Sequence, residues 1–456
     1  MRRVLLFLSA VLCAAGALAR EPTEVMFFFD TEDYTSDRAN DAVVMIAKTF
    51  TDAGVRGHFA IVGYLAQKWM DYGRKDVVEA LKPHLVGTQT MYHSLHPNIL
   101  EMADERDVNI ACANVLKQEK EGVELIRKAL GRDDLVCGVP PGNSKSYAAM
   151  YAWADLGLPF FCDTVVYDDA DGDIWYCNQR HYNYDFSLES FMPSRTEKPD
   201  FDRILDGFAT RRRVICYLHP NMAIFTKFWD WDAYRGGNNV PFGKWEKLPE
   251  RPAEETAEYL RRLGAFARRI KEDPRFRIVT LEDKLPSRPR RAITKADMPM
   301  LYGWMEQHIR DVREPASWCV ADVFQAAVRF LRGEGETLPG KVYGFSEEPH
   351  IVKGLVRITR DEMVAAARRI DLTTFVPSSI AVGNAKLGPG DFLVGALQLL
   401  ATDADAVTLY ERPQYERGWK GLAAFHPKGT WTHMKDFRDK VASDRLRWQI
   451  WTLRYE

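Results

Sequence analysis

An unbroken apolar run, Val25-Met26-Phe27-Phe28-Phe29, ends abruptly at Asp30 and is followed closely by Glu32 and Asp33. A strand that is buried on both faces of a parallel sheet has such a continuous hydrophobic sequence. The run therefore predicts a central parallel strand with three carboxylates at its carboxyl end, which is where α/β barrels carry their active sites. Because burying neighbouring acids is costly unless a cation or a reaction needs them, this position is the first candidate for a metal site or a catalytic base.

Strand and helix patterns alternate along the first two thirds of the chain. We expect helices near residues 41–53, 75–81, 107–130, 148–156 and 253–270, and strands near residues 25–29, 58–62, 85–86, 159–162, 214–218 and 276–281. Repeated strand–helix units predict a parallel sheet that is covered by helices. The number of these units favours a closed barrel over an open sheet.

A proline-rich basic segment, residues 286–291, follows the last predicted strand and marks a domain boundary. We therefore expect an α/β domain over residues 20–290 and a smaller, mainly helical domain over residues 291–456. Within the second domain, residues 321–331 can be aligned with residues 390–400. This similarity has two interpretations, a duplicated helical unit or a chance match between amphipathic helices.

The charge balance and the hydrophobic content limit the classes of function. The chain has 456 residues, of which 46% are hydrophobic, and this predicts a large core and more than one domain. With 62 Lys and Arg against 64 Asp and Glu residues, the chain has no excess of positive charge that would favour nucleic acid or an anionic membrane surface. A neutral ligand such as a sugar is compatible with this balance.

The amino-terminal sequence indicates the compartment. Residues 1–19 have the order of a secretory signal peptide, with a basic start, an apolar stretch and a small-residue end. We expect a secreted or periplasmic protein, without a transmembrane segment, because no later segment approaches ~20 consecutive apolar residues. Removal of the signal leaves six of the seven cysteines. Their spacing lacks a CxxC pair, which excludes a zinc finger and leaves any disulfide pairing open.

Three predicted strands are followed by residues that can carry chemistry. Asp30 ends the first strand, a turn with His93 and His96 follows the strand at residues 85–86, and His219 follows the strand at residues 214–218. In a parallel barrel all three strand ends face the same rim. A carboxylate and imidazoles on one rim are the side chains of metal-assisted hydrolysis, which needs a cation, a base for water and an acid for the leaving group.

These motifs, in this order and spacing, resemble those of the polysaccharide deacetylases of carbohydrate esterase family 4, over about residues 24–285. The stretch around Asp30 is similar to the first motif, Pro140-Pro141-Gly142-Asn143-Ser144 to the third, and Cys216-Tyr217-Leu218-His219-Pro220 to the last. The resemblance implies an α/β fold with a distorted (β/α)7 barrel, followed here by the mainly helical domain. It also implies hydrolysis of N-acetyl or O-acetyl groups on a cell-wall or environmental polysaccharide, including peptidoglycan-type glycan.

The resemblance also implies roles for individual residues. Asp30 is expected to be the catalytic base and His219 the catalytic acid. A divalent metal, with zinc as the expected ion, would be bound by His93 together with Glu32 or Asp33.

Further residues are expected around the substrate. Pro141 and Gly142 would lie along its path, and aromatic side chains would stack on sugar rings, with four candidates: Trp175, Tyr176, Trp229 and Trp231. Packing over the barrel mouth is an equally open interpretation of the aromatic cluster near residue 229. Asp163 is a candidate partner that tunes His219, and His96 either supports the site or caps a turn.

Two positions depart from the family pattern. The second motif is His-(Ser or Thr)-x-x-His in the family, but here it starts with Gln89 and ends with His93. An amide oxygen is a poor zinc ligand, so metal affinity should fall unless His96 or Asp33 completes the set. The third motif has residues 138–139 where the family has an Arg, so the base loses an expected partner. The alternative function is therefore a catalytically silent, glycan-binding protein of the same fold.

The C-terminal domain also has two interpretations. Its internal similarity and the final segment, residues 448–453, resemble modules that are appended to such deacetylases and are distantly similar to pseudomurein-binding repeats. The resemblance implies binding to a cell wall. The alternative is a helical domain that only buttresses the barrel.

Overall fold

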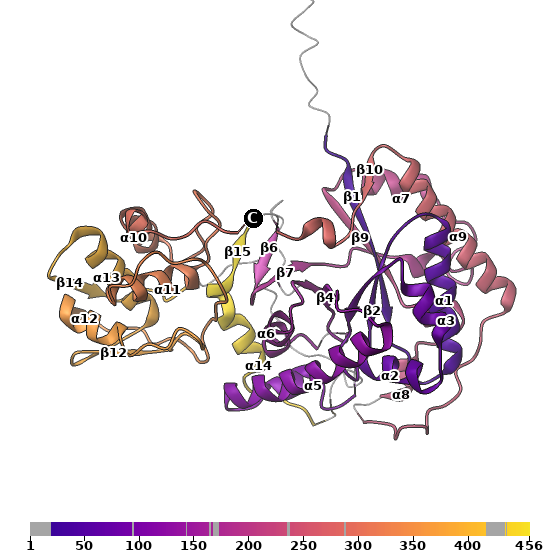
Figure 1. The fold of residues 1–456 in the computed structure, drawn as a ribbon, viewed down its shortest axis with the longest axis horizontal. Helices are drawn as coiled ribbons and strands as arrows, with labels where there is room; N and C mark the ends of the chain where they lie inside the picture. Colours follow the sequence, from indigo (N-terminus) through magenta and orange to yellow (C-terminus); the bar gives the residue numbers. More distant parts are fainter. Residues whose placement is uncertain are drawn as a thin grey trace, which may run out of the picture.

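The structure is a computed structural model that describes residues 20–93, 95–142, 144–163, 166, 173–234, 238–286, 289–415, 434 and 436–456. The predicted signal peptide, residues 1–19, lies outside the described residues, as do the side chains of Trp231 and Asp232. The described chain forms two lobes, each with its own hydrophobic core (Figure 1). No helix within these ranges is long and apolar enough to cross a bilayer.

An eleven-stranded sheet forms the centre of the first lobe, in the order β15-β6-β7-β5-β4-β3-β2-β1-β9-β8, with β10 paired to β1. Most neighbouring strands are parallel, whereas β6 pairs antiparallel with β7 and with β15. The mainly parallel sheet that the sequence predicts is therefore confirmed. The strands are β1 (Thr23–Thr31), β2 (His58–Ile61), β3 (Leu85–Thr88), β4 (Cys137–Gly138), β5 (Phe160–Cys162), β6 (Ile174–Tyr176), β7 (Gln179–Tyr182), β8 (Phe186–Ser187), β9 (Arg213–Leu218), β10 (Phe276–Ile278) and β15 (Arg454–Tyr455).

The sheet curves back toward β1. Residues 179–187 form a continuous stretch whose first part, β7, pairs with β5 and whose last part, β8, pairs with β9, the neighbour of β1. Between the two parts, the backbone N–H of Asp185 donates to the carbonyl of Ile215 at 2.9 Å. This stretch links the two sides of the parallel sheet around an inner group of apolar side chains that includes Phe28 and Phe160.

Strand β1 is buried on both faces, as its continuous apolar sequence predicts. Phe27 and Phe29 belong to the core under the covering helices, whereas Met26 and Phe28 belong to the inner group, and all four are at most 1% exposed. Side chains alternate along a strand with a period of two. Asp30 therefore follows Phe28 on the inner side of the sheet.

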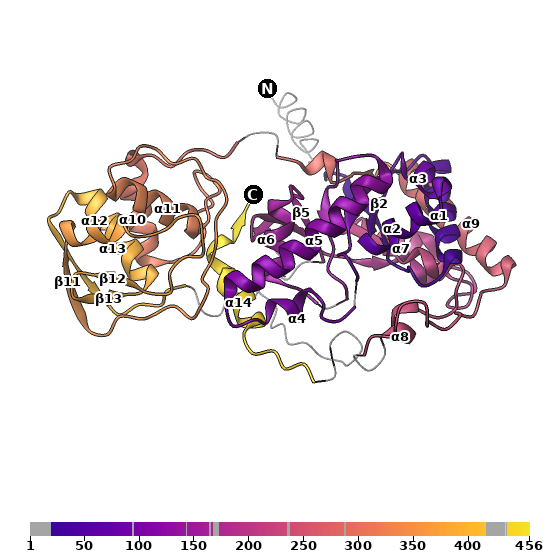
Figure 2. The same cartoon turned by 60° about the horizontal axis from the view of Figure 1, so that its bottom comes forward.

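Helices lie around the sheet of the first lobe (Figures 1 and 2). Helix α1 starts at Asp37, earlier than the sequence indicated, and the chain then turns at Gly54, whose φ of +67° favours glycine. Helix α5 matches its predicted range and is capped by Asp107, which accepts from Asn109 N at 2.8 Å. The helices are α1 (Asp37–Asp52), α2 (Gly63–Asp71), α3 (Lys75–Leu81), α4 (Ile99–Ala103), α5 (Val108–Leu130), α6 (Tyr147–Asp155), α7 (Phe201–Phe208), α8 (Trp229–Ala233) and α9 (Ala253–Glu272).

The second lobe combines helices with two small antiparallel sheets. Strand β11 pairs with β14, and β12 pairs with β13. The helices pack around a separate hydrophobic core. The elements are α10 (Met298–Gln307), α11 (Val320–Leu331), β11 (Leu355–Thr359), α12 (Arg360–Ala367), β12 (Ile380–Val382), β13 (Ala385–Leu387), α13 (Pro389–Thr402) and β14 (Ala406–Tyr410).

The two segments with similar sequence form helices α11 and α13. Asp322 and Asp391 occupy the same position in the first turn of each helix and accept from the backbone N–H three residues earlier, at 2.9 and 3.2 Å. Each of these aspartates also pairs with an arginine, Arg290 and Arg412 respectively. The two helices therefore begin alike, and a duplicated unit stays a prediction.

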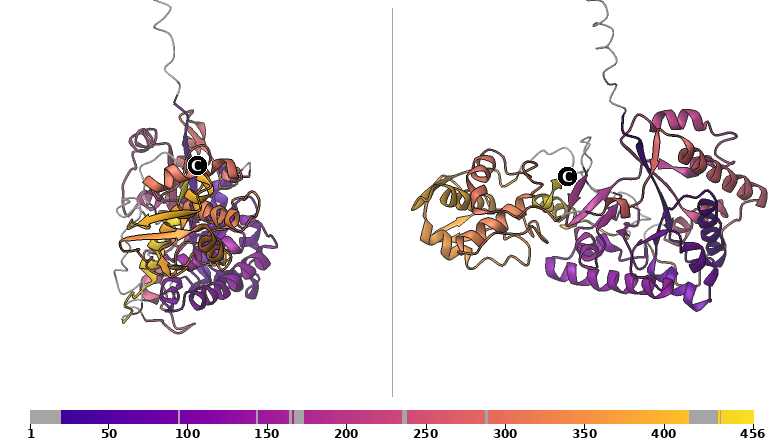
Figure 3. Two further views of the ribbon diagram at one scale, coloured as in Figure 1. Left: turned by 90° about the vertical axis from the view of Figure 1, so that its left-hand side faces the viewer. Right: turned by 45° about the horizontal axis from the view of Figure 1, so that its top comes forward.

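The end of the chain returns to the first lobe and lies between the lobes (Figure 3). Strand β15 extends the central sheet beside β6, and helix α14 (Ala442–Trp448) contacts α4 and α6. Gln449 joins both lobes, because its Oε1 accepts from the hydroxyl of Tyr151 at 2.5 Å and its Nε2 donates to the carbonyl of Phe345 at 2.9 Å. The predicted domain division between residues 290 and 291 stays a prediction.

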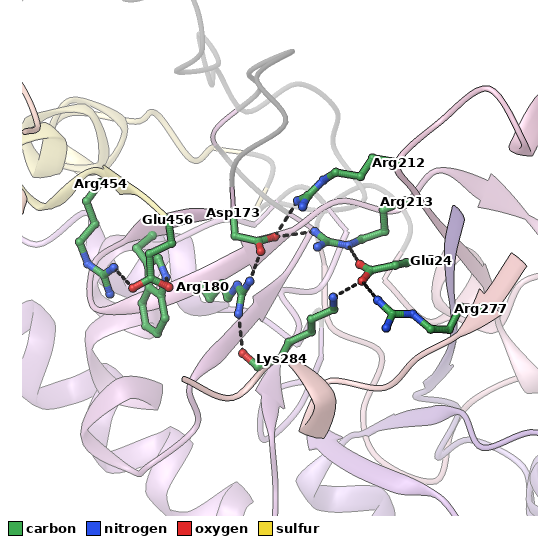
Figure 4. A network of polar contacts seen from close by, with 10 residues as sticks. Glu24, Asp173, Arg180, Arg212, Arg213, Arg277, Lys284, Arg454 and Glu456 are labelled. Atoms are coloured by element: carbon green, nitrogen blue, oxygen red, sulfur yellow. Dashed lines mark hydrogen bonds and ion pairs between the residues drawn. The ribbon is translucent and has the colours of Figure 1, made fainter. Parts of the chain in front are cut away.

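An ion-pair network joins strands at the end of the sheet where β1 and β9 begin (Figure 4). Glu24 of β1 accepts from Arg213 of β9 at 3.1 Å and from Arg277 of β10 at 2.7 Å. Asp173 lies 2.8 Å from Arg213 and also pairs with Arg180 of β7. Because this end lies opposite the carboxyl ends of the strands, we assign the network a structural role.

Glu119 of α5 is a buried acid that links two further segments. It accepts from the indole N–H of Trp153 at 2.8 Å and from the backbone N–H of Met91 at 3.4 Å. Burial raises the pKa of Glu119 from 4.5 to about 7. Because this pKa is raised in the folded state, the stability it contributes is complete below the unfolded pKa and is lost as the pH rises through about 7.

We expect Glu119→Gln to remove part of the fall in the free energy of unfolding between about pH 5 and pH 8, and to stabilise the protein by about 1–3 kcal/mol at the upper end. Urea unfolding at a series of pH values measures this slope. Glu121→Gln, an exposed acid on the same helix, is the matched control and should leave the slope unchanged. An identical slope in native and Glu119→Gln protein would contradict the expectation.

Candidate active site

The carboxyl ends of β1, β3 and β9 open into one cavity of about 550 Å³. Each of these strands is followed by polar side chains that line it. The predicted site residues in its lining are Asp30, Glu32, Gln89, His93, Gly142, Asp163 and His219. The structure therefore brings together segments that are far apart in the sequence.

Asp30 and His219 face each other where β1 and β9 end. The parallel register places Phe29 opposite Leu218, so the next residue of each strand is a neighbour of the other. His219 Nε2 lies 3.7 Å from Asp30 Oδ2. Asp30 Oδ1 accepts a hydrogen bond from the hydroxyl of Tyr184 at 2.9 Å. One carboxylate oxygen is thus held by a tyrosine while the other faces an imidazole.

A second carboxylate holds the other side of the His219 ring. His219 Nδ1 donates to Glu189 Oε1 at 2.6 Å. Asp163, which we expected to tune His219, instead pairs with Lys145 at 3.2 Å. Glu189 lies in the single 3₁₀ turn Leu188–Phe191. This bond makes Nδ1 the donor and leaves Nε2 to act toward Asp30 and the cavity.

Burial and neighbouring charges set the protonation of this pair. Burial raises the pKa of Asp30 to about 7, and the charge of Glu32 adds to the rise, although His219 partly offsets it. Burial lowers the pKa of His219, but Glu32 and Glu189 raise it more, to about 9. At neutral pH His219 is therefore protonated and Asp30 is partly ionised, which are the states of an acid and a base.

Glu32 and His93 form a second, more deeply buried pair. His93 Nε2 lies 2.8 Å from Glu32 Oε2, and Trp229 Nε1 donates to Glu32 Oε1 at 3.0 Å. On its other side, His93 Nδ1 lies 3.7 Å from Asp230 Oδ1. Burial lowers the pKa of His93, but Glu32 and Asp230 raise it more, to about 10. Burial raises the pKa of Glu32, but His93 and His219 lower it more, to below its usual value.

The donor atoms near His93 decide which metal the site suits. Among the His, Cys, Asp and Glu side chains that the structure describes, no three are grouped so that they could hold a metal ion. Glu32 and His93 are conventional ligands, and Asp230 beside the second ring nitrogen is a common partner of a metal-bound histidine. Gln89 Oε1 is buried and accepts no hydrogen bond within the described ranges. These donors fit a divalent cation that accepts oxygen ligands better than they fit zinc.

Two residues that could have completed the metal shell do not line the cavity. Asp33 Oδ1 accepts from the backbone N–H of Thr35 at 2.9 Å and from its hydroxyl at 2.7 Å. His96 Nδ1 bonds to Glu101 Oε2 at 2.9 Å. Both side chains therefore have local partners that hold their own turns.

The predicted substrate-binding residues lie in different places. Trp229 is 1% exposed and forms a wall beside Glu32, whereas Pro141 stands between two cavity-lining residues, Pro140 and Gly142. Trp175 lies away from this lining, because its indole N–H donates to Glu456 at 2.8 Å and Arg454 stacks on its ring. Tyr176 also bonds to the C-terminal segment. The predicted stacking role of Trp231 concerns a side chain outside the described residues.

Several residues that hold the site are not predicted from the sequence, above all Glu189, Tyr184, Lys145 and Asp230. The alternation of Tyr182 and Tyr184 in the stretch 179–187 was a signal for a strand with both rings on the inner side. Glu189 has no comparable signal, because a one-turn helix leaves no periodic pattern. Such partners are found only when the fold is known.

No protein-family model matches the chain, and no curated protein matches it. Among solved structures, the chain is similar to a family 4 carbohydrate esterase from Streptomyces lividans in complex with acetate, with 12% identity, 58% of this chain and 95% of that chain covered, and a TM-score of 0.32. It is also similar to a putative polysaccharide deacetylase from Mycobacterium smegmatis, with 14% identity and a TM-score of 0.37. That match covers 58% of this chain and 88% of the other. A match to a 4-alpha-glucanotransferase from Thermococcus litoralis has 11% identity and a TM-score of 0.39. It covers 59% of this chain and 41% of the other. Because these TM-scores are low, we infer function from the site itself.

We expect Glu189→Gln to lower the pKa of His219 from about 9 by about 1 or more. The neutral amide no longer favours the protonated imidazole, although it can still accept the hydrogen bond from Nδ1. NMR titration of the histidine ring protons measures the pKa. Glu197→Gln, an exposed acid in the same region, is the control and should leave it unchanged. An unaltered pKa in Glu189→Gln would show that the contact with Glu189 does not stabilise the imidazolium.

Proposed function

We propose that the protein is an exported carbohydrate deacetylase that hydrolyses N-acetyl or O-acetyl groups on a polysaccharide. The observation that carries this proposal is the pairing of Asp30 with His219 on a cavity that Glu32 and His93 also line. Hydrolysis of an acetyl group needs a base for water and an acid for the leaving group, and these two side chains suit both roles. The motif order that resembles polysaccharide deacetylases supports a sugar substrate.

In the proposed reaction, Asp30 accepts a proton from water as the water oxygen bonds to the acetyl carbon. His219 Nε2 then gives its proton to the nitrogen or oxygen of the sugar while the bond to the acetyl carbon breaks, so that acetate and a free amine or hydroxyl are released. Glu189 stabilises the protonated ring through Nδ1. The backbone at Gly142, which lines the cavity, is the candidate donor for the oxyanion.

Glu32, His93 and the amide oxygen of Gln89 are the residues that would hold a divalent cation, which the resemblance implies. When bound, such a cation would polarise the acetyl carbonyl and lower the pKa of water. Trp229 and Asp230 orient the two conventional ligands by contacts at 3.0 and 3.7 Å.

The proposal also includes the architecture of the chain and its division into domains. We interpret the curved sheet as a distorted seven-stranded barrel that is formed by β1 to β5, the stretch 179–187 and β9. Residues 20–290 would be the catalytic domain, after removal of the signal peptide. Residues 291–456 would be a mainly helical module that holds the enzyme on cell-wall glycan.

The second candidate function is glycan binding without catalysis. Gln89 stands where the deacetylase motif has a metal-binding histidine, and His93 is already paired with Glu32 at 2.8 Å. A weak cation site would leave the cavity able to hold a sugar but slow to hydrolyse it. This candidate predicts sugar binding with no release of acetate.

The substitution Gln89→His tests the ligand position. We expect it to raise zinc affinity by about tenfold or more, because imidazole is a stronger zinc ligand than an amide oxygen. Metal content after dialysis and acetate release from a chitin oligomer measure the two effects. Thr90→Ser, beside it, is the control. Acetate release by the native protein would exclude the silent candidate, and release by Gln89→His alone would exclude the enzyme candidate for the natural chain.

The substitution Asp30→Asn tests the base. We expect acetate release to fall by about 10²–10⁴-fold, because an amide cannot accept the proton of water, while affinity for the oligomer changes little. Initial rates and calorimetric titration measure the two quantities. Asp185→Asn, on the neighbouring stretch of the sheet, is the control. An active Asp30→Asn protein would remove Asp30 from the mechanism.

A further inference from the structure

A second cavity, of about 680 Å³, lies beside the candidate active site and is rich in aromatic side chains. Its lining comes from the segment after β1 and the start of α1, from α2 and the residues that follow it, and from the irregular segment between α8 and α9. The aromatic residues in the lining are Tyr34, Tyr64, Tyr72, Phe242 and Trp245. Among the residues that the structure describes, none lines both this cavity and the first one.

One aromatic wall separates the two cavities. The ring of Tyr34 packs edge-on against the ring of Trp229, with centroids 4.9 Å apart, and Trp229 donates to Glu32 at 3.0 Å. Glu32 and Tyr34 are two residues apart, so their Cα atoms lie within about 7 Å of each other. The two cavities therefore lie next to each other, on either side of this wall.

The aromatic lining leaves ring surface available to a ligand. Tyr72 is 61% exposed and Phe242 is 45% exposed. Phe242 is nevertheless held in place, because its ring centroid lies 4.9 Å from that of Tyr64 and 5.4 Å from that of Trp245. Exposed rings in a concave surface are typical of a binding site. The C–H face of a sugar ring packs well on such rings.

Two cations line the cavity, and their surroundings differ. Arg74 forms ion pairs with Asp37, Asp41 and Asp76 at 2.8–2.9 Å, so these carboxylates more than balance its charge. The ammonium of Lys68 lies over the rings of Tyr64 and Tyr72, 5.1 and 5.3 Å from their centroids. No ion pair joins Lys68 to a carboxylate in the part of the chain that the structure describes. At Lys68 the cavity therefore offers a positive charge above an aromatic surface, whereas the side at Arg74 carries an excess of carboxylates.

We propose that this cavity is a second carbohydrate-binding site and that it takes a sugar unit carrying a carboxylate. Lys68 pairs with the carboxylate, while Phe242 and Tyr64 pack against the ring. The inference rests on the proposed function in one respect, because it takes the ligand to be a polysaccharide. It adds a determinant of substrate specificity, because only a polysaccharide whose acidic unit binds here would place its acetyl group in the first cavity.

Binding of three tetrasaccharides to the full-length protein tests this proposal. One is the neutral N-acetylglucosamine tetramer, and the others alternate N-acetylglucosamine with glucuronic acid or with N-acetylmuramic acid. We expect at least one acidic tetrasaccharide to bind about tenfold more tightly than the neutral one by calorimetry, which is the usual effect of a charged hydrogen bond. The two acidic sugars carry the carboxylate at different ring positions, so they distinguish its source.

Substitutions of Lys68 and Phe242 test whether these residues cause the preference for an acidic tetrasaccharide. Lys68→Met is expected to lower affinity for the preferred acidic tetrasaccharide about tenfold while changing affinity for the neutral tetramer less than about twofold. Lys68→Arg should keep the preference, which separates loss of charge from a folding defect. Phe242→Ala should weaken all binding by about five- to tenfold. Lys75→Met and Leu338→Ala change exposed residues outside the cavity. They should alter neither the affinity for the acidic tetrasaccharide nor the affinity for the neutral tetramer.

Equal affinity for the three sugars, no binding of any of them, or an unchanged preference in Lys68→Met would overturn this inference. Acetate release, measured separately, tells the two proposals apart. Release of acetate, together with an unchanged affinity of Lys68→Met for both acidic tetrasaccharides, keeps the deacetylase proposal and ends this one. Binding that depends on Lys68 without release of acetate supports this site and ends the deacetylase proposal.

Discussion

Asp30 and Glu32 are both buried at the carboxyl end of β1, where an uncompensated carboxylate would be strongly unfavourable. Each carboxylate is balanced by an imidazole from another part of the chain, His219 for Asp30 and His93 for Glu32. These contacts exist because the ends of β1, β3 and β9 share one edge of a parallel sheet. Since side chains alternate along a strand, a shift of β9 by one residue would turn His219 to the other face.

The two acid–imidazole pairs differ in what they can do. His219 keeps about a fifth of its side chain exposed, 22%, and faces the cavity between Asp30 and Glu189. His93 is almost fully enclosed, 3% exposed, between Glu32, Asp230 and the ring of Trp229. The first pair is therefore suited to proton transfer with a ligand. The second is suited to holding a cation or, without one, to neutralising its own charges.

The aromatic wall between the two cavities contacts residues on both sides. Trp229 holds Glu32 through its indole N–H and contacts Tyr34 through its ring, and Tyr34 in turn packs against the aromatic residues of the second cavity. A substitution on one side of this wall should affect the other side, because Glu32 lines the first cavity and Tyr34, two residues later, lines the second. Positions in the aromatic cavity should therefore be tested together with activity at the first site.

The amino-acid sequence alone predicts the buried strand β1, the parallel sheet, and the convergence of five residues: Asp30, Glu32, Gln89, His93 and His219. These features follow from local rules, because an apolar run specifies burial and parallel strands end at the same edge. The hydrogen-bond partners of these side chains, in contrast, depend on how distant segments pack together. Glu189 rather than Asp163 holds His219, and β15 draws Trp175 to the C-terminal segment. Such choices depend on distances between segments that no local pattern encodes.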